Sequence, residues 1–282
     1  MVRRSSPMLR RQELGHRLRG MRSQAQMTMA EVADRLMVSA TKISRIESGA
    51  RGVSYRDIQD LCLLYGADDE ERRQLMALAR QGRERSWWHG YRLPFSALID
   101  FENAAAAISD YKSAIVPGLL QTEAYARQLF QARVPPLEPG TLTQRLEARM
   151  TRQDLVKNRS VQFLFVLDEA VLHRVVGGMQ VMHEQLWTVL DRAGQTNVEL
   201  RILPFSSGAH PALESNFTLI ELEEGEASPA VVYVEGLLGN HYLRSEAGIL
   251  RYRGVLDSLM DCTLTASASA DVIRTFIDRY AP

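Results

Sequence analysis

The 282-residue chain has 45% hydrophobic and 24% charged residues and no formal net charge, which is typical of a globular protein of about two domains. It contains no run of 18 apolar residues and no apolar N-terminal segment, so the sequence predicts neither a membrane span nor a signal peptide. Cys62 and Cys262 lie in apolar helical patterns without metal-ligand spacing, which excludes a disulfide-rich or cysteine–zinc protein and predicts a reduced, cytoplasmic one.

The charge is unevenly distributed along the chain. Residues 1–56 contain twelve lysine and arginine residues and four acidic residues, a formal charge of +8, which leaves −8 for the remainder. A basic N-terminal part on an acidic body indicates a polyanionic partner for the first part only. Residues 1–7 are expected to form a disordered basic arm, which either follows a DNA backbone or is simply a frayed terminus.

Five helices are predicted in the first 81 residues, because amphipathic stretches alternate with capping residues and glycines. Residues 8–81 are therefore expected to form an all-α five-helix domain. The expected helices cover about residues 8–23, 29–36, 40–47, 55–65 and 68–81.

The stretch from Thr28 to Gly49 organises this domain. Thr28 and Ser39 can cap two short helices that are joined by a tight turn. The second helix, 40–47, has few apolar positions, so most of its surface is small, polar or basic. Two short helices of this kind occur in many helical bundles. A cationic second helix with few apolar residues, however, favours a helix-turn-helix that binds double-stranded DNA in the major groove.

The outer face of this segment supplies the DNA-binding candidates. Helix N-terminal amides and hydroxyls suit phosphate, whereas side chains near the start and middle of the second helix can reach base edges. Ala40, Thr41 and Arg45 are assigned to base edges. The candidates expected at the helix start or on the DNA backbone are Thr28, Arg35, Ser39, Lys42, Ser44 and Arg51.

The segment resembles the Cro/cI-type, or xenobiotic-response-element, helix-turn-helix of bacterial and phage repressors. The resemblance covers about Leu14–Leu78 and rests on a small residue at the helix crossing, two buried isoleucines and the closing run ISRIESG. It implies that Arg22 pairs with Glu47. Two positions depart from the family: Met29 stands where a glutamine often contacts phosphate, and Met37 stands where glycine often adopts a left-handed backbone, which predicts local strain.

Residues 82–93 are expected to form a linker or junction. Their charged half suits a linker, but Trp87, Trp88 and Tyr91 favour docking against the second domain. A ligand or partner pocket built from these aromatic residues, with Glu235 and His241 beside the loop GLLGNH, is the alternative hypothesis.

Residues 94–282 alternate helical and strand-like patterns and then show consecutive strand-like runs, which predicts an α/β domain with a mixed sheet of about four or five strands. The expected helices cover about 98–111, 122–129, 142–157, 172–176, 182–193, 249–263 and 269–280. The expected strands cover 161–167, 198–203, 217–222, 230–234 and, more weakly, 241–243.

This half also resembles a known arrangement, the antitoxin-like domain of unknown function that follows such a helix-turn-helix in actinobacteria. The resemblance rests on the ordered phrases VPGLLQTEAYAR, RMTRQ, LDEAVLHRVVGG, LRILPF, GAH and VVYVEG, from about Trp87 onward. It implies a developmental or antibiotic-related transcription factor, often encoded beside a small partner protein. It implies no chemistry.

The second half shows no catalytic motif. Asp168 and Glu169 at a strand end, with His173 four residues after Glu169, could place carboxylate and imidazole together. Helix capping is the preferred explanation for the two acids, and His173 and His210 are expected at surface or satisfied, partly buried positions. Because nucleophile-elbow, phosphate-loop, dinucleotide and zinc-protease motifs are absent from the sequence, we expect no enzyme, no metal and no cofactor.

The sequence therefore predicts a homodimeric, cytoplasmic, sequence-specific transcriptional regulator whose second domain holds the dimer or senses a signal. Two alternatives remain open for that domain. It could mainly bind a small partner protein encoded nearby, or it could sense a small-molecule effector. No membrane partner is expected.

Overall fold

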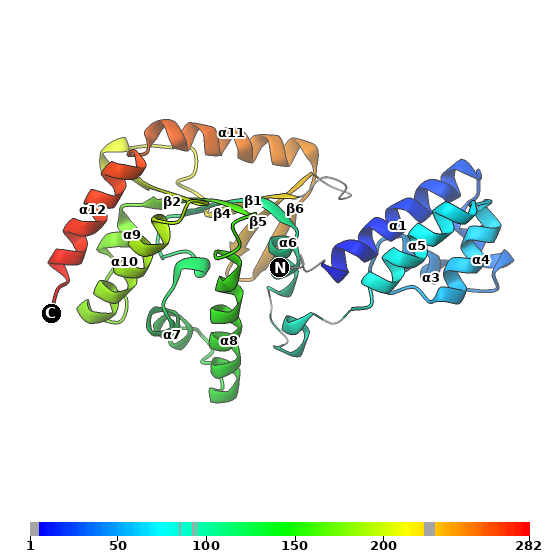
Figure 1. Ribbon diagram of the computed structural model, residues 1–282, viewed down its shortest axis with the longest axis horizontal. Coiled ribbons are helices and arrows are strands. Elements are labelled where there is room, and N and C mark those ends of the chain that lie inside the picture. The colour runs from blue at the N-terminus through cyan, green and yellow to red at the C-terminus, as the bar shows by residue number, and fades with distance from the viewer. Residues whose placement is uncertain (1–5, 85, 92, 94, 223–228) are drawn as a thin grey trace. The chain divides into compact units, whose positions relative to one another are not determined.

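The computed structural model describes residues 6–84, 86–91, 93, 95–222 and 229–282 (Figure 1). It divides into two units, which are considered separately. The first unit contains the described residues within 1–90, 96–104 and 223–229, and the second contains those within 91–95, 105–222 and 230–282. The expected fold class is confirmed, since the first unit is helical and the second contains a mixed sheet with helices.

The five N-terminal helices lie within one residue of their expected bounds. Hydrogen bonds that N-cap side chains accept from backbone amides explain this agreement, because each links residues three positions apart and so depends on local sequence. A sixth helix, which the sequence places in the second domain, packs in the first unit. The helices are α1 (Pro7–Gln24), α2 (Met29–Arg35), α3 (Ala40–Glu47), α4 (Tyr55–Tyr65), α5 (Asp69–Gln81) and α6 (Ser96–Asn103).

The start of α1 is anchored rather than frayed. Ser6 caps the helix by accepting a hydrogen bond from the Leu9 amide, and its hydroxyl donates to Asp100 Oδ1 at 2.7 Å. Ser6 and Pro7 are both buried. The arm expected over 1–7 is therefore wrong for its last two residues, because burial and capping hold them in the fold; residues 1–5 lie outside the described residues.

One core holds α1 to α5 together. Its members are buried apolar side chains that recur on one face of each helix, as the sequence pattern predicts. The backbone of α1 also approaches α3 very closely, because a Cβ built on Gly15 would lie 2.5 Å from the Glu47 carbonyl oxygen. The core residues include Leu14, Leu18, Val32, Ala33, Ile43, Ile46, Ile58, Leu61 and Leu75.

The second unit is built on one six-stranded sheet of order β3-β2-β1-β4-β5-β6. Strands β1, β2 and β3 are parallel, and β4, β5 and β6 continue the sheet as antiparallel neighbours beyond β1. The strands are β1 (Ala105–Lys112), β2 (Gln162–Asp168), β3 (Val198–Leu203), β4 (Phe217–Leu222), β5 (Ala230–Gly236) and β6 (Gly239–Leu243).

The helix expected over 98–111 is wrong in its second half. It ends as α6 at Asn103, and the alanine-rich run that follows is β1, which pairs with β2 on one side and β4 on the other. The alanines favour helix locally, but the hydrogen bonds and burial available between two strands outweigh that preference. This strand also accounts for a six-stranded sheet in place of the four or five expected strands.

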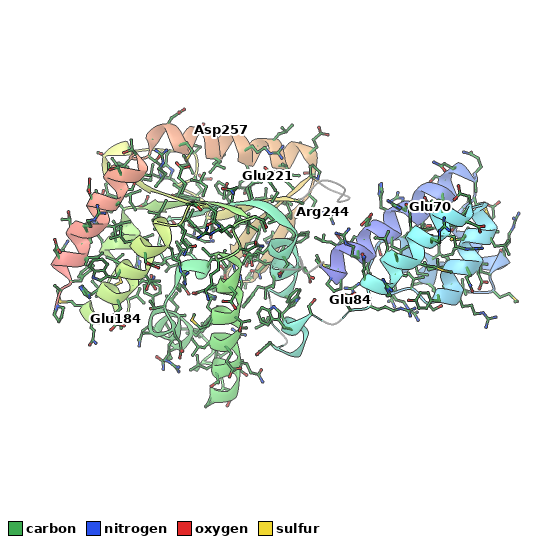
Figure 2. All side chains as sticks on the ribbon, in the orientation of Figure 1. Glu70, Glu84, Glu184, Glu221, Arg244 and Asp257 are labelled. Carbon is green, nitrogen blue, oxygen red and sulfur yellow. The ribbon has the colours of Figure 1, made fainter. Side chains whose placement is uncertain are left out.

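Helices cover both faces of the sheet. In Figure 1, α11 lies on one face, whereas α7, α8 and α10 lie on the other. Helix α11 is tied to β4 by a two-fold ion pair between Arg253 and Glu221, with nitrogen–oxygen distances of 2.8 and 2.6 Å; Figure 2 labels Glu221. The remaining helices are α7 (Glu123–Gln131), α8 (Pro139–Arg152), α9 (Ala170–His173), α10 (Met179–Ala193), α11 (Glu246–Cys262) and α12 (Ala266–Arg279).

Other predicted helix boundaries also shift, and the helices expected over 142–157 and 172–176 are examples. The helix expected over 142–157 begins at Pro139, whose fixed backbone suits the first turn, and ends at Arg152, followed by a 3₁₀ turn over Gln153–Leu155. The helix expected over 172–176 is instead α9, which starts two residues earlier, where the Ala170 amide donates to Asp168 Oδ1 at 2.8 Å.

The turn between α2 and α3 carries the strain that the resemblance implies. Met37 has a φ of 51°, in the left-handed region that disfavours side chains other than glycine, and its own side chain is 92% exposed. The side chain therefore contributes little packing to offset the backbone cost.

We expect Met37→Gly to raise the free energy of unfolding by about 1 kcal/mol, because glycine adopts a positive φ without a Cβ clash. Urea denaturation of the full chain measures the change. Met37→Ala is the control: it removes the same exposed side chain without relieving the backbone, so its stability should stay within about 0.5 kcal/mol of the wild type. Equal effects of the two variants would contradict the strain.

Gly15→Ala tests the close approach of α1 to α3. A methyl group there meets backbone oxygen atoms, so we expect a loss of about 1–3 kcal/mol in the free energy of unfolding. Gly20→Ala, on the same helix with no atom within 4 Å of its added Cβ, should instead gain up to about 1 kcal/mol from helix propensity. A stabilising Gly15→Ala would rule out the close packing.

Candidate nucleic-acid interface

The α2–turn–α3 segment is fixed at both helix starts by side-chain caps. Thr28 and Glu31 form a reciprocal capping box, in which the Glu31 amide donates to Thr28 Oγ1 at 3.2 Å and the Thr28 amide donates to Glu31 Oε2 at 2.7 Å. The hydrogen bonds that the Thr28 amide and then the Thr28 hydroxyl donate to the carboxylate lower the pKa of Glu31. At α3, the Lys42 amide donates to Ser39 Oγ at 3.2 Å. Among the described residues, the Ser39 hydroxyl accepts this hydrogen bond and donates none.

The inner side of α3 is anchored by packing and by one ion pair. Ile43 and Ile46 are buried, each 2% exposed. Arg22 Nε lies 2.6 Å from Glu47 Oε1, and Arg22 Nη2 lies 2.9 Å from Oε2, so the guanidinium and carboxylate pair in two-fold geometry. The hydrogen bond to Glu47 raises the pKa of Arg22 despite its partial burial. The pairing that the resemblance implies for Arg22 and Glu47 is present.

The outer side of the segment is open to solvent. The structure places the nine DNA-binding candidates on α2, the turn, α3 and the loop that follows, and only Lys42 among them is partly buried. The exposed candidates are Thr28, Arg35, Ser39, Ala40, Thr41, Ser44, Arg45 and Arg51.

The cations of this surface differ in their partners. Within the described residues, neither Arg45 nor Arg51 forms an ion pair, so both guanidinium groups are free to bind an external anion or base edge. Lys42 instead places its Nζ 2.6 Å from Asp57 Oδ1 on α4. The sequence did not reveal this contact, because it joins two helices across a loop.

The residues of the junction pocket hypothesis belong to both units, and each is described within its own unit. Trp88 is 2% exposed, and its ring meets Trp87 edge-to-face with centroids 5.5 Å apart, so Trp88 is a buried packing residue of the first unit. Tyr91 belongs to the second unit, together with Glu235 and His241. The last two are exposed on β5 and β6, on either side of the hairpin turn.

A polar cluster that the sequence did not reveal lies at the carboxyl end of β1 and β2. His210 Nε2 lies 3.9 Å from Asp168 Oδ2, and the His210 ring meets the Tyr111 ring with centroids 5.8 Å apart. The His210 side chain is only 3% exposed and Tyr111 is fully buried. Burial and then the nearby Asp168 raise the pKa of Tyr111.

This cluster has unpaired polar atoms in its interior. Among the described residues, the Tyr111 hydroxyl and both ring nitrogens of His210 have no hydrogen-bond partner. The only hint in the sequence was the short phrase GAH, which contains His210, and nothing local placed it beside Asp168. Glu169 and His173, weighed with them as candidates, form a separate contact at 3.2 Å on α9.

Within the described ranges, no group of three or more histidine, cysteine, aspartate or glutamate side chains could hold a metal ion. In the same part of the chain, each helix is too short or too polar to cross a membrane.

Comparison with known families agrees with the two-part organisation. Residues 13–75 match a family described as a helix-turn-helix domain, and residues 95–275 match a domain of unknown function, DUF5753. No curated protein and no solved structure matches the chain. The helix-turn-helix match, together with the exposed basic face of α3, indicates a DNA-binding regulator. The DUF5753 match covers more than half of the sequence, and the chain therefore belongs to the DUF5753 family, with a helix-turn-helix domain at its N-terminus.

Proposed function

We propose that the protein is a sequence-specific transcriptional regulator of the Cro/cI, or xenobiotic-response-element, type, which places α3 in the major groove of DNA. The observation that carries this proposal is the combination of a helix-turn-helix match with a recognition helix whose inner side is anchored and whose outer side is small, polar and basic. We propose no enzymatic activity.

The contacts divide by what each side chain can reach. Ala40, Thr41 and Arg45 face the base edges, where an arginine reads guanine O6 and N7 through two hydrogen bonds. The side chains around them fix the register on the phosphates without reading sequence. The residues proposed to contact the phosphates are Arg35, Ser39, Ser44 and Arg51. Thr28, another candidate, lies at the N-terminus of α2.

We propose that the regulator binds as a homodimer. One module of this size buries a modest area on DNA, so useful selectivity needs two half-sites about one helical turn apart. The DUF5753 domain is the natural place for the dimer contact, because it contributes most of the chain.

Arg45→Ala should relax sequence preference, with an operator affinity loss of about 1–3 kcal/mol, because it removes a base-edge contact. Arg51→Ala should weaken binding to all duplexes alike and reduce the slope of log affinity against log salt by about 0.9 per half-site. Fluorescence anisotropy on a selected operator and on a random duplex, over a salt series, measures both.

Arg19→Ala serves as the control for charge alone, since Arg19 is exposed on α1, outside the α2–α3 segment. It should leave the operator-to-random affinity ratio unchanged. Equal loss on both duplexes for Arg45→Ala would refute its base-edge role, and absence of any duplex binding by the wild type would refute the proposed function.

A second function, sensing of a small polar molecule by the DUF5753 domain, is favoured by one observation. Buried polar groups normally have hydrogen-bond partners, yet Tyr111 and His210 have none among the described residues. The site lies at the carboxyl ends of parallel strands, where open α/β sheets commonly bind ligands. The rival hypothesis, a small protein partner encoded nearby, is supported by the sequence resemblance.

Tyr111→Phe tests this second function. Without a ligand, removal of an unpaired buried hydroxyl should leave the melting temperature unchanged or raise it. A low-molecular-mass fraction of cell extract should raise the melting temperature of the wild type and not that of the variant. Tyr252→Phe, in the ring cluster around Phe217, is the control and should respond like the wild type. Equal shifts in melting temperature for Tyr111→Phe and the wild type would exclude this site. Co-purification of a small protein would favour the rival hypothesis of a protein partner.

A further inference from the structure

The two cations of the recognition helix have opposite surroundings. Arg45 is exposed and has no ion-pair partner among the described residues, whereas Lys42 is paired with Asp57 at 2.6 Å. The side chains of this pair are 23% and 25% exposed, so the ammonium is partly withdrawn from solvent. Lys42 is therefore not a freely moving surface cation, although it lies in the first turn of the helix that enters the groove.

The partner carboxylate is itself held in place. The Ser54 amide donates to Asp57 Oδ2 at 3.4 Å, and the Asp57 amide donates to Ser54 Oγ at 3.0 Å, so Asp57 is part of the cap of α4. Oδ1 then remains for Lys42. Partial burial opposes ionisation of Asp57, but the hydrogen bonds from Lys42 and Ser54 outweigh it and hold the pKa of Asp57 below its usual value. Asp57 is thus ionised at neutral pH.

We propose that Asp57 is a specificity-determining residue, which positions Lys42 toward a base edge and withholds it from phosphate. The inference rests on the proposed DNA-binding function and names a positioning residue within it. It also changes the role expected for Lys42 from the sequence, where it was assigned to the DNA backbone.

The chemistry of the ammonium group explains how one contact can be kept while another is made. Lys42 Nζ has three donors, so it can stay bonded to Asp57 Oδ1 and still donate to O6 or N7 of a guanine. A guanine edge is uncharged and does not repel the carboxylate. A phosphate group would bring a second negative charge beside Asp57, and counterion release would be smaller because the Lys42 charge is already neutralised. The pair therefore disfavours sequence-independent binding.

The test compares Asp57→Asn with the wild type, on an operator obtained by in vitro selection with the wild-type protein and on a random duplex of equal length. In Asp57→Asn, the Lys42 ammonium group loses its carboxylate partner and should then bind phosphate. We expect affinity for random DNA to rise, its salt slope to steepen by about 0.9 per half-site, and the operator-to-random ratio to fall. Fluorescence anisotropy over a salt series gives all three quantities.

Asp60→Asn is the matched control. It makes the same charge change on the same helix, but Asp60 lies 3.9 Å from Arg56 and not against the recognition helix. If simple loss of a negative charge were responsible, the two variants would behave alike, and that result would overturn the inference. The double variant Lys42→Ala/Asp57→Asn should return the salt slope on random DNA to the wild-type value.

Lys42→Ala keeps the inference testable if Asp57→Asn weakens the cap of α4 and impairs folding. We expect it to lower operator affinity roughly 5- to 150-fold, the range for one base contact, and to leave the salt slope on random DNA unchanged. A shallower salt slope on random DNA would mean that Lys42 contacts phosphate. That result would overturn this inference but not the proposed function. Failure of the wild type to bind any duplex would instead overturn the proposed function.

Discussion

The recognition helix depends on the close approach of α1 to the C-terminal end of α3. A helix of eight residues is not stable by itself, so its position must come from tertiary packing. Gly15 lets the two backbones meet, and the Arg22–Glu47 ion pair joins the same two helices through their side chains. Because that pair is largely buried, removal of either partner would leave an uncompensated charge, which makes the arrangement specific to one geometry.

This anchoring divides the charges of α3 into internal and external groups. Glu47 is satisfied by Arg22 and Lys42 by Asp57, and among the described residues no such partner is present for Arg45. Of the four cationic candidates on the outer surface, only Lys42 has an ion-pair partner among the described residues, so Arg35, Arg45 and Arg51 supply its uncompensated positive charge. Because Asp57 lies beyond residue 56, the formal charge of +8 counts Lys42 without the carboxylate that pairs with it.

The described part of the DUF5753 domain contains both buried amide groups that are hydrogen-bonded and buried polar atoms that are not. Its sheet is covered by helices on both faces, and side chains such as Gln185 and Asn197 are buried with their amide groups hydrogen-bonded. Among the described residues, the Tyr111 hydroxyl and the His210 ring nitrogens have no hydrogen-bond partner, although His210 lies 3.9 Å from Asp168. The chain thus combines a helix-turn-helix domain with a DUF5753 domain in which the Tyr111 and His210 side chains lie buried at the carboxyl ends of the parallel strands.

The sequence alone determined the ends of the N-terminal helices, the outer face of α3 and most of the strands, because caps and hydrophobic periodicity act between residues a few positions apart. It did not determine that Ala105–Lys112 is the central strand, since alanines favour helix locally and only β2 and β4 supply the competing hydrogen bonds. Likewise, the Lys42–Asp57 pair and the approach of His210 to Asp168 join residues across loops whose path no local pattern encodes. Tertiary structure decided these contacts, because they form only when separate elements have packed together.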